Sequence, residues 1–144
     1  MRIEGRWLAG QDGIERPVFD GYLDAPTGVR LACSFLLDTG ADFTVLAPDV
    51  VDQLAGIVAP IATSTTANGI GGSQQVYDIA VDLVFFAVAG QQVRISGPLP
   101  IFVTPGTIEL SVLERDFIDQ FTLVYARSRN VLRLLTPPDI VSDD

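Results

Sequence analysis

"FLLDTGADFTVL", residues 35–46, places an acid, a hydroxyl and a glycine between two apolar segments. Taking an ionised carboxylate out of water is very costly, so Asp38 needs an explanation in a stretch that otherwise has the composition of one buried strand. Two explanations are open. Asp38, Thr39 and Gly40 form either a solvated turn between two short strands, or a site at which the fold holds a carboxylate because its chemistry is needed.

The length and composition of the chain predict one folded domain. Its 144 residues fit a single domain of ordinary size, and the 48% hydrophobic content is distributed along the whole length. Two prolines and a terminal acid pair predict a loose tail at 137–144. We therefore expect a single domain spanning residues 1–144.

The charge pattern limits the partners. The chain has 18 acidic and 9 basic residues, all of the latter arginine, so the formal net charge is −9 and there is no basic cluster for nucleic acid.

The longest apolar run, 79–90, is interrupted by Asp82 and is shorter than the roughly 20 residues of a membrane-spanning helix. The N-terminus lacks an apolar signal-peptide core, and Cys33 is the sole cysteine. These features predict a soluble cytoplasmic protein with no nucleic-acid or membrane partner.

Histidine is absent from the sequence, which excludes Ser-His-Asp and Cys-His catalytic groups and leaves carboxylates as the acid–base reagents. Cys33, in an apolar segment, is expected to fill the core. Six other acids have structural explanations at helix starts, on a polar strand face or on an exposed helix face: Asp49, Asp52, Asp78, Asp82, Asp116 and Asp119. We expect no metal and no cofactor.

Short apolar segments separated by turn residues predict an all-β fold closed like a barrel. The expected strands are 3–8, 17–24, 28–37, 43–46, 57–62, 76–88, 92–96, 99–103, 108–113, 121–126 and 130–135. Two short helices are expected. Pro48 near the start and Gly56 after the end delimit the first, at 47–56, and the second lies at 115–121.

A second motif is "NGIGGS", residues 68–73. Its three glycines around Ile70 predict a hairpin tip whose backbone adopts unusual conformations and lets another chain approach closely. An ordinary flexible hairpin is the plainer interpretation. A phosphate-binding loop is disfavoured because no Lys-Ser/Thr ending follows.

A third motif is "SVLERDFIDQF", residues 111–121, an apolar strand followed by Arg115-Asp116 and a short helix. In this order and spacing, the three motifs over roughly 28–135 resemble the retroviral-type aspartic proteases, or retropepsins, and their cellular and bacterial relatives. That family has two apolar residues before Asp-Thr-Gly-Ala, a glycine-rich flap about thirty residues later, and an apolar-apolar-Gly-Arg-Asp/Asn step into a C-terminal helix.

The resemblance implies a role for each matching residue. Asp38 would be the catalytic carboxylate, and Thr39, Gly40 and Ala41 its active-site loop. Arg115 would brace this loop by pairing with Asp42. The residues that would line the substrate cleft or its flap are Leu36, Asp42, Phe43, Val45, Asn68, Gly69, Ile70, Gly71 and Val112.

The sequence departs from the family pattern at two positions. Glu114 stands where the family usually has glycine, so either the backbone there tolerates a side chain or the local corner differs. Phe43 replaces an acid common in the viral enzymes, which predicts a more apolar substrate preference beside it.

The expected chemistry needs two carboxylates that cannot both ionise: one polarises the carbonyl and the other takes a proton from the attacking water. The sequence contains Asp-Thr-Gly once, so the partner must come from a second copy across a twofold axis. We expect a homodimeric aspartic endopeptidase, with a peptide or protein substrate and best activity at mildly acidic pH. Segments 3–8 and 17–24 could pair within the monomer, cover an edge or join the interface.

Two other interpretations stay open. A dimer of the same fold could bind extended peptides without cutting them, an interpretation that Glu114 favours. Alternatively, an unrelated small barrel could contain a structural Asp-Thr-Gly turn, in which case nothing would require a dimer.

Overall fold

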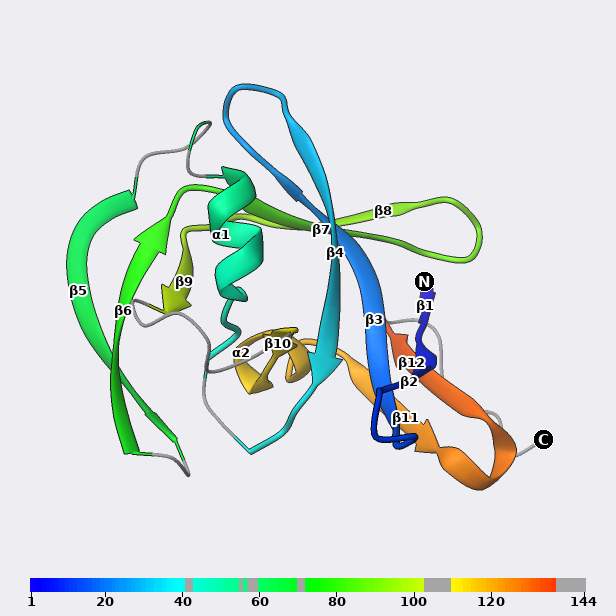
Figure 1. The fold of residues 1–144 in the computed structure, drawn as a ribbon. Coiled ribbons are helices and arrows are strands. Elements are labelled where there is room, and N and C mark those ends of the chain that lie inside the picture. Colours follow the sequence, from blue (N-terminus) through cyan, green and yellow to red (C-terminus); the bar gives the residue numbers. More distant parts are fainter. Residues whose placement is uncertain (41–42, 55, 57–59, 70–71, 103–109, 137–144) are drawn as a thin grey trace.

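The computed structural model describes residues 1–40, 43–54, 56, 60–69, 72–102 and 110–136, which form a mostly β structure with two short α-helices (Figure 1). The strands fall into three sheets, and among these residues they do not close into the barrel that the sequence led us to expect. No helix in the described part of the chain is long and apolar enough to cross a membrane.

The largest sheet holds the Asp38 segment. Its strand order is β10-β4-β3-β7-β8, with β2 added to β3. All neighbours in it are antiparallel except β10 and β4. The strands are β2 (Arg6–Ala9), β3 (Glu15–Asp24), β4 (Arg30–Leu37), β7 (Asp82–Phe86), β8 (Gln92–Ile95) and β10 (Ser111–Leu113).

A second sheet joins the two ends of the described chain. It is antiparallel, in the order β1-β12-β11, and consists of β1 (Arg2–Glu4), β12 (Val131–Leu135) and β11 (Thr122–Ala126). The 3₁₀ turn η1 (Arg127–Arg129) connects β11 to β12, and Asn130 closes it in the left-handed conformation. The expected strand 3–8 is therefore divided at Gly5 between two sheets. Both parts pair within the monomer, which answers one question that the sequence left open.

The third sheet, in the order β5-β6-β9, contains the hairpin predicted from the glycine motif. It consists of β5 (Pro60–Gly69), β6 (Gly72–Ile79) and β9 (Leu99–Phe102). Helices α1 (Pro48–Leu54) and α2 (Arg115–Ile118) lie where the sequence predicted helices, although α2 is shorter than the expected 115–121. Figure 1 shows α1 between the hairpin sheet and the largest sheet.

The core combines buried side chains of all three sheets and both helices, and the largest sheet contributes alternate residues to it. In β3, Phe19 and Leu23 are fully buried, with Gly21 between them on the same face. A Cβ on Gly21 would meet the ring of Phe85 at 2.7 Å, so this ring packs directly on the glycine backbone. Phe85 also contacts Phe117 of α2, with ring centroids 5.2 Å apart. Phe117 therefore joins α2 to the core of the sheet.

Candidate active site

Asp38 follows the last residue of β4 and lies exposed at the end of the strand. Its backbone N–H donates to the carbonyl of Leu113 at 3.0 Å. Its Oδ1 accepts a hydrogen bond of 2.8 Å from the backbone N–H of Gly40. A Cβ on Gly40 would lie only 3.1 Å from this oxygen, so any residue other than glycine would crowd the Asp38 carboxylate. The carboxylate thus avoids the cost of burial, because the apolar strand ends just before it.

Strand β10 lies between the two arms of the chain that flank Asp38. On one side, Val112 is aligned with Leu36 in the parallel β4–β10 pair. On the other, Val112 and Val45 exchange two backbone hydrogen bonds of 3.1 and 2.9 Å. Backbone pairing therefore brings together Leu36, Val45 and Val112, three residues predicted to line the cleft. Strand β10 fixes the chain on both sides of Asp38, and the chain between Leu37 and Thr44 is called the Asp38 loop.

Helix α2 is attached to the same loop through Thr44, whose side chain is buried. The N–H and Oγ1–H of Thr44 donate to Oδ1 of Asp116 at 2.9 and 2.7 Å. Thr44 Oγ1 in turn accepts a 3.0 Å hydrogen bond from the N–H of Glu114. Asp116 is exposed, as the sequence predicted, but its contact with Thr44 was not predicted. An acid at the start of a helix gave no sign of its distant partner.

A buried hydroxyl connects the strand before Asp38 to the segment after it. Ser111 Oγ accepts a 2.9 Å hydrogen bond from the backbone N–H of Ala47. The Sγ–H of Cys33 donates to the same oxygen at 3.4 Å. Cys33 is buried, as the sequence predicted, and burial raises the pKa of its thiol to about 11. It is therefore a core residue, held as the neutral thiol.

The structure describes some of the other predicted site residues and leaves out others. Thr39 is exposed beside Asp38, and 53% of the surface of Phe43 is exposed. Asn68 pairs with Ser73, and Gly69 with Gly72, at the end of the β5–β6 hairpin. Ala41, Asp42, Ile70 and Gly71 lie outside the described residues.

Two predictions about the α2 corner have different outcomes. Arg115 begins α2, but its expected partner Asp42 is outside the described residues, so their pairing stays a prediction. Glu114, where the family usually has glycine, has φ −112° and ψ −175°, an extended conformation open to any residue. Its side chain is only 3% exposed. The backbone therefore tolerates a side chain at this position.

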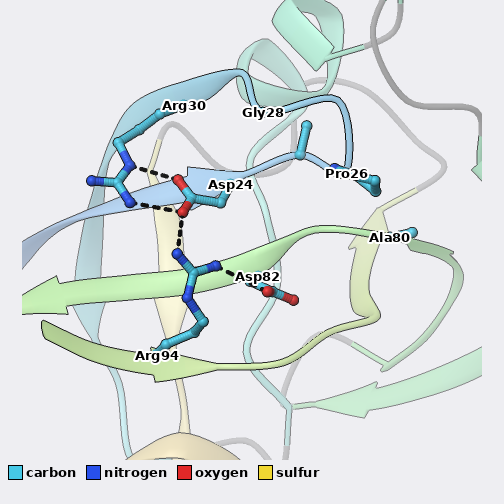
Figure 2. A pocket seen from close by; sticks show the side chains of 8 residues that line it. Asp24, Pro26, Gly28, Arg30, Ala80, Asp82 and Arg94 are labelled. Atoms are coloured by element: carbon cyan, nitrogen blue, oxygen red, sulfur yellow. Dashed lines mark hydrogen bonds and ion pairs between the residues drawn. The ribbon is translucent and has the colours of Figure 1, made fainter.

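A separate hollow of about 420 Å³ lies over β3, β7 and β8 and contains none of the predicted site residues. Figure 2 shows Asp24 between Arg30 and Arg94, with Arg94 also contacting Asp82. Hydrogen bonds from Arg30 and then Arg94 lower the pKa of Asp24 to about 2. Two acids balance two arginines here, which indicates a structural charge network. Among the described residues, no group of three or more Cys, Asp or Glu side chains could hold a metal ion.

Comparisons with known proteins place these observations in context. A family described as "Aspartyl protease" matches residues 27–117, a range that includes the Asp38 turn, the hairpin and the start of α2. The crystal structure of a retropepsin-like aspartic protease from Rickettsia conorii is similar to this chain, with a TM-score of 0.53 and 18% sequence identity. The similarity covers 93% of this chain and 88% of that one. A search of curated protein sequences found no match.

Proposed function

Because this chain belongs to the aspartyl protease family, we propose that it is a homodimeric aspartic endopeptidase with Asp38 as its catalytic residue. The observation that carries this proposal is the position of Asp38. It is an exposed carboxylate at the end of a core strand, within a turn that is fixed by Leu113 on one side and Gly40 on the other.

The reaction requires a pair of carboxylates. In the proposed dimer, Asp38 of each protomer approaches the twofold axis, and the two side chains share one proton. The ionised member removes a proton from a water molecule, whose oxygen attacks the peptide carbonyl, and the protonated member donates its proton to the carbonyl oxygen. Collapse of the tetrahedral intermediate breaks the C–N bond, and the nitrogen takes up a proton to leave as the amine.

The substrate is proposed to bind as an extended strand between the Asp38 loop and the β5–β6 hairpin. Leu46 N–H donates to the carbonyl of Pro100 in β9 at 3.2 Å, so the sheet that contains the hairpin is attached directly to this loop. We propose that residues 68–71 act as a flap that excludes water from the reacting carbonyl. Exposed Phe43 would favour apolar substrate side chains beside it.

The test is cleavage of a diverse pool of unstructured peptides at about pH 4 to 7, with the cut sites identified by mass spectrometry. Asp38→Asn is compared with wild type and with Asp52→Asn, a matched change at an exposed acid of α1. We expect cuts between apolar residues that disappear only in Asp38→Asn. Equal cleavage by wild type and Asp38→Asn would refute the proposed role of Asp38.

The alternative function is a dimer that binds extended peptides without cutting them. It is favoured by Glu114, whose carboxylate is buried next to the segment that holds Asp38. A folded dimer that binds peptides but leaves them intact would support it. In that case, cleavage gained on Glu114→Gly would identify the residue responsible. The cytoplasmic location expected from the lone Cys33 stays a prediction.

A further inference from the structure

Among the residues that the structure describes, Glu114 is the only buried acid, with 3% of its surface exposed. Removing a carboxyl group from water is costly unless hydrogen bonds or opposite charges compensate for it. Neither the backbone nor the adjoining helix explains the acid. Its φ of −112° and ψ of −175° are open to any residue, and its side chain makes no capping hydrogen bond to α2. The buried side chain of Glu114 therefore needs another explanation.

The peptide group between Leu113 and Glu114 contacts both ends of the Asp38 loop. Its carbonyl oxygen accepts the 3.0 Å hydrogen bond from the backbone N–H of Asp38. Its N–H donates to Oγ1 of Thr44, also at 3.0 Å. Because a peptide group is planar and rigid, these two hydrogen bonds cannot move independently of each other. A tilt of this single group would therefore displace Asp38 and Thr44 together.

Two buried side chains flank this peptide group. Leu113 is fully buried at the end of β10, and Glu114 follows it in an extended conformation. Successive side chains of extended backbone point to opposite sides, so Leu113 and Glu114 anchor the peptide group from two sides. The carbonyl of Glu114 also accepts hydrogen bonds of 3.1 and 2.9 Å from the N–H groups of Phe117 and Ile118 in α2. Loss of the Glu114 side chain would leave one side of the peptide group without its anchor.

We propose that Glu114 is a positioning residue of the peptidase, whose buried side chain fixes the Leu113–Glu114 peptide group and, through it, the backbone of Asp38. This inference rests on the proposed function, in which Asp38 must lie close enough to its counterpart to share a proton. A small displacement of Asp38 would raise the barrier of the chemical step. Val112 and Val45 keep their own backbone pairing, so substrate binding should change little. The side chain of Glu114 should therefore affect kcat more than KM.

The first experiment measures kcat and KM for a peptide that the cleavage pool identifies as a substrate. Glu114→Ala is expected to reduce kcat at least roughly tenfold and to change KM less than about twofold. Glu114→Gln keeps the length of the side chain and an acceptor oxygen, so its kcat should stay within about threefold of wild type. Leu23→Val is the control for lost stability. Leu23 is fully buried and pairs with Leu31, at the opposite end of β4 from Asp38.

The second experiment needs no substrate. The exchange rate of the Asp38 amide hydrogen, measured by NMR in deuterated water, reports how firmly its hydrogen bond to the Leu113 carbonyl is held. We expect this rate to rise at least roughly tenfold in Glu114→Ala and to stay near the wild-type value in Glu114→Gln and Leu23→Val. The exchange rate therefore tests the anchoring of Asp38 separately from the chemistry.

The outcomes separate this inference from the proposed function. Cleavage that depends on Asp38, together with unchanged kcat and exchange in Glu114→Ala, would overturn the role of Glu114 alone. Equal losses in Glu114→Ala and Leu23→Val would also overturn it, because the effect would then be one of stability. So would a Glu114→Gln variant as impaired as Glu114→Ala, or a gain of cleavage in Glu114→Gly. A wild-type protein that cuts no peptide would overturn both the peptidase and the role of Glu114 in it.

Discussion

Thr44 and Asp116 are 72 positions apart in the sequence, yet the backbone N–H and the hydroxyl of Thr44 both donate to the same carboxylate oxygen of Asp116. A third donor, the N–H of Phe117, reaches that oxygen at 2.8 Å. The carboxylate therefore joins the first turn of α2 to the chain just after the Asp38 turn. Because Phe117 is packed in the core, this junction gives the loop a rigid support.

Replacing Asp116 by alanine should weaken both stability and catalysis. The loss of hydrogen bonds to a charged group is expected to lower the free energy of unfolding by about 1 to 3 kcal/mol. Displacement of the loop should reduce kcat/KM by about tenfold to a hundredfold. Asp116→Asn keeps an acceptor oxygen and should lie nearer to wild type. Urea denaturation and peptide cleavage measure the two effects, with Asp119→Ala as the matched control; equal losses in both alanine variants would contradict the role of Asp116.

Ser111→Ala should lower the free energy of unfolding although it removes only a single oxygen atom. The buried N–H of Ala47 would lose its acceptor, at a cost of about 1 to 3 kcal/mol. Thermal and urea unfolding are compared with those of Ser128→Ala, at an exposed position in η1. If Ser111→Ala is as stable as the control, the hydrogen bond to Ala47 has no net effect.

Gly21→Ala tests the close packing of Phe85 on β3. An added methyl group would lie within 3 Å of both this ring and the carbonyl of Val84, so the core must shift. We expect a loss of about 1 to 3 kcal/mol in the free energy of unfolding. Gly56→Ala is the control, because a Cβ at that position meets nothing within 4 Å.

The Asp24 network predicts how stability responds to acid. The pKa of Asp24 in the folded protein is about 2, below the unfolded value near 3.9, so its contribution is complete above about pH 4 and is lost as the pH falls through 2. Melting temperatures between about pH 6 and pH 2 should fall less steeply below pH 4 for Asp24→Asn than for wild type. Parallel curves for the two proteins would contradict this role.

Phe43 should affect the choice of substrate more than stability. It is largely exposed, so Phe43→Asp is expected to change the free energy of unfolding by less than about 0.5 kcal/mol. The same change should reduce cleavage beside large apolar residues, as measured in the peptide pool. Phe43→Leu is the matched control. An unchanged set of cut sites in Phe43→Asp would show that Phe43 does not contact the substrate.

The sequence predicted most local elements, because their signals are local. Pro48 and Gly56 delimited α1, the glycines of 68–73 indicated the hairpin, and short apolar segments separated by turn residues indicated the strands. It did not predict three separate sheets. The division of 3–8 at Gly5 depends on a distant side chain, since a Cβ there would meet Leu132 at 2.5 Å.

The candidate site was predicted as a set of residues, without the contacts that support it. Leu36, Val45 and Val112 are brought together by the parallel pairing of β4 with β10 and by the bridge between Val45 and Val112, which no local pattern specifies. Asp116 was predicted to be exposed and is exposed, but a carboxylate in the first turn of a helix is common for electrostatic reasons alone and so gave no sign of a further contact. Its actual partner, Thr44, is recognisable only once the chain is folded.

The hydrogen bond from Asp38 to Leu113 also constrains the order of events during synthesis. The Asp38 turn leaves the ribosome well before β10 exists, and closure of so long a loop is slow compared with local hairpin formation. Until Leu113 has emerged, the nascent chain contains the Asp-Thr-Gly sequence without the strand that holds it in place. In the proposed peptidase, the support of Asp38 by β10 is therefore complete only once residues up to Leu113 have been synthesised.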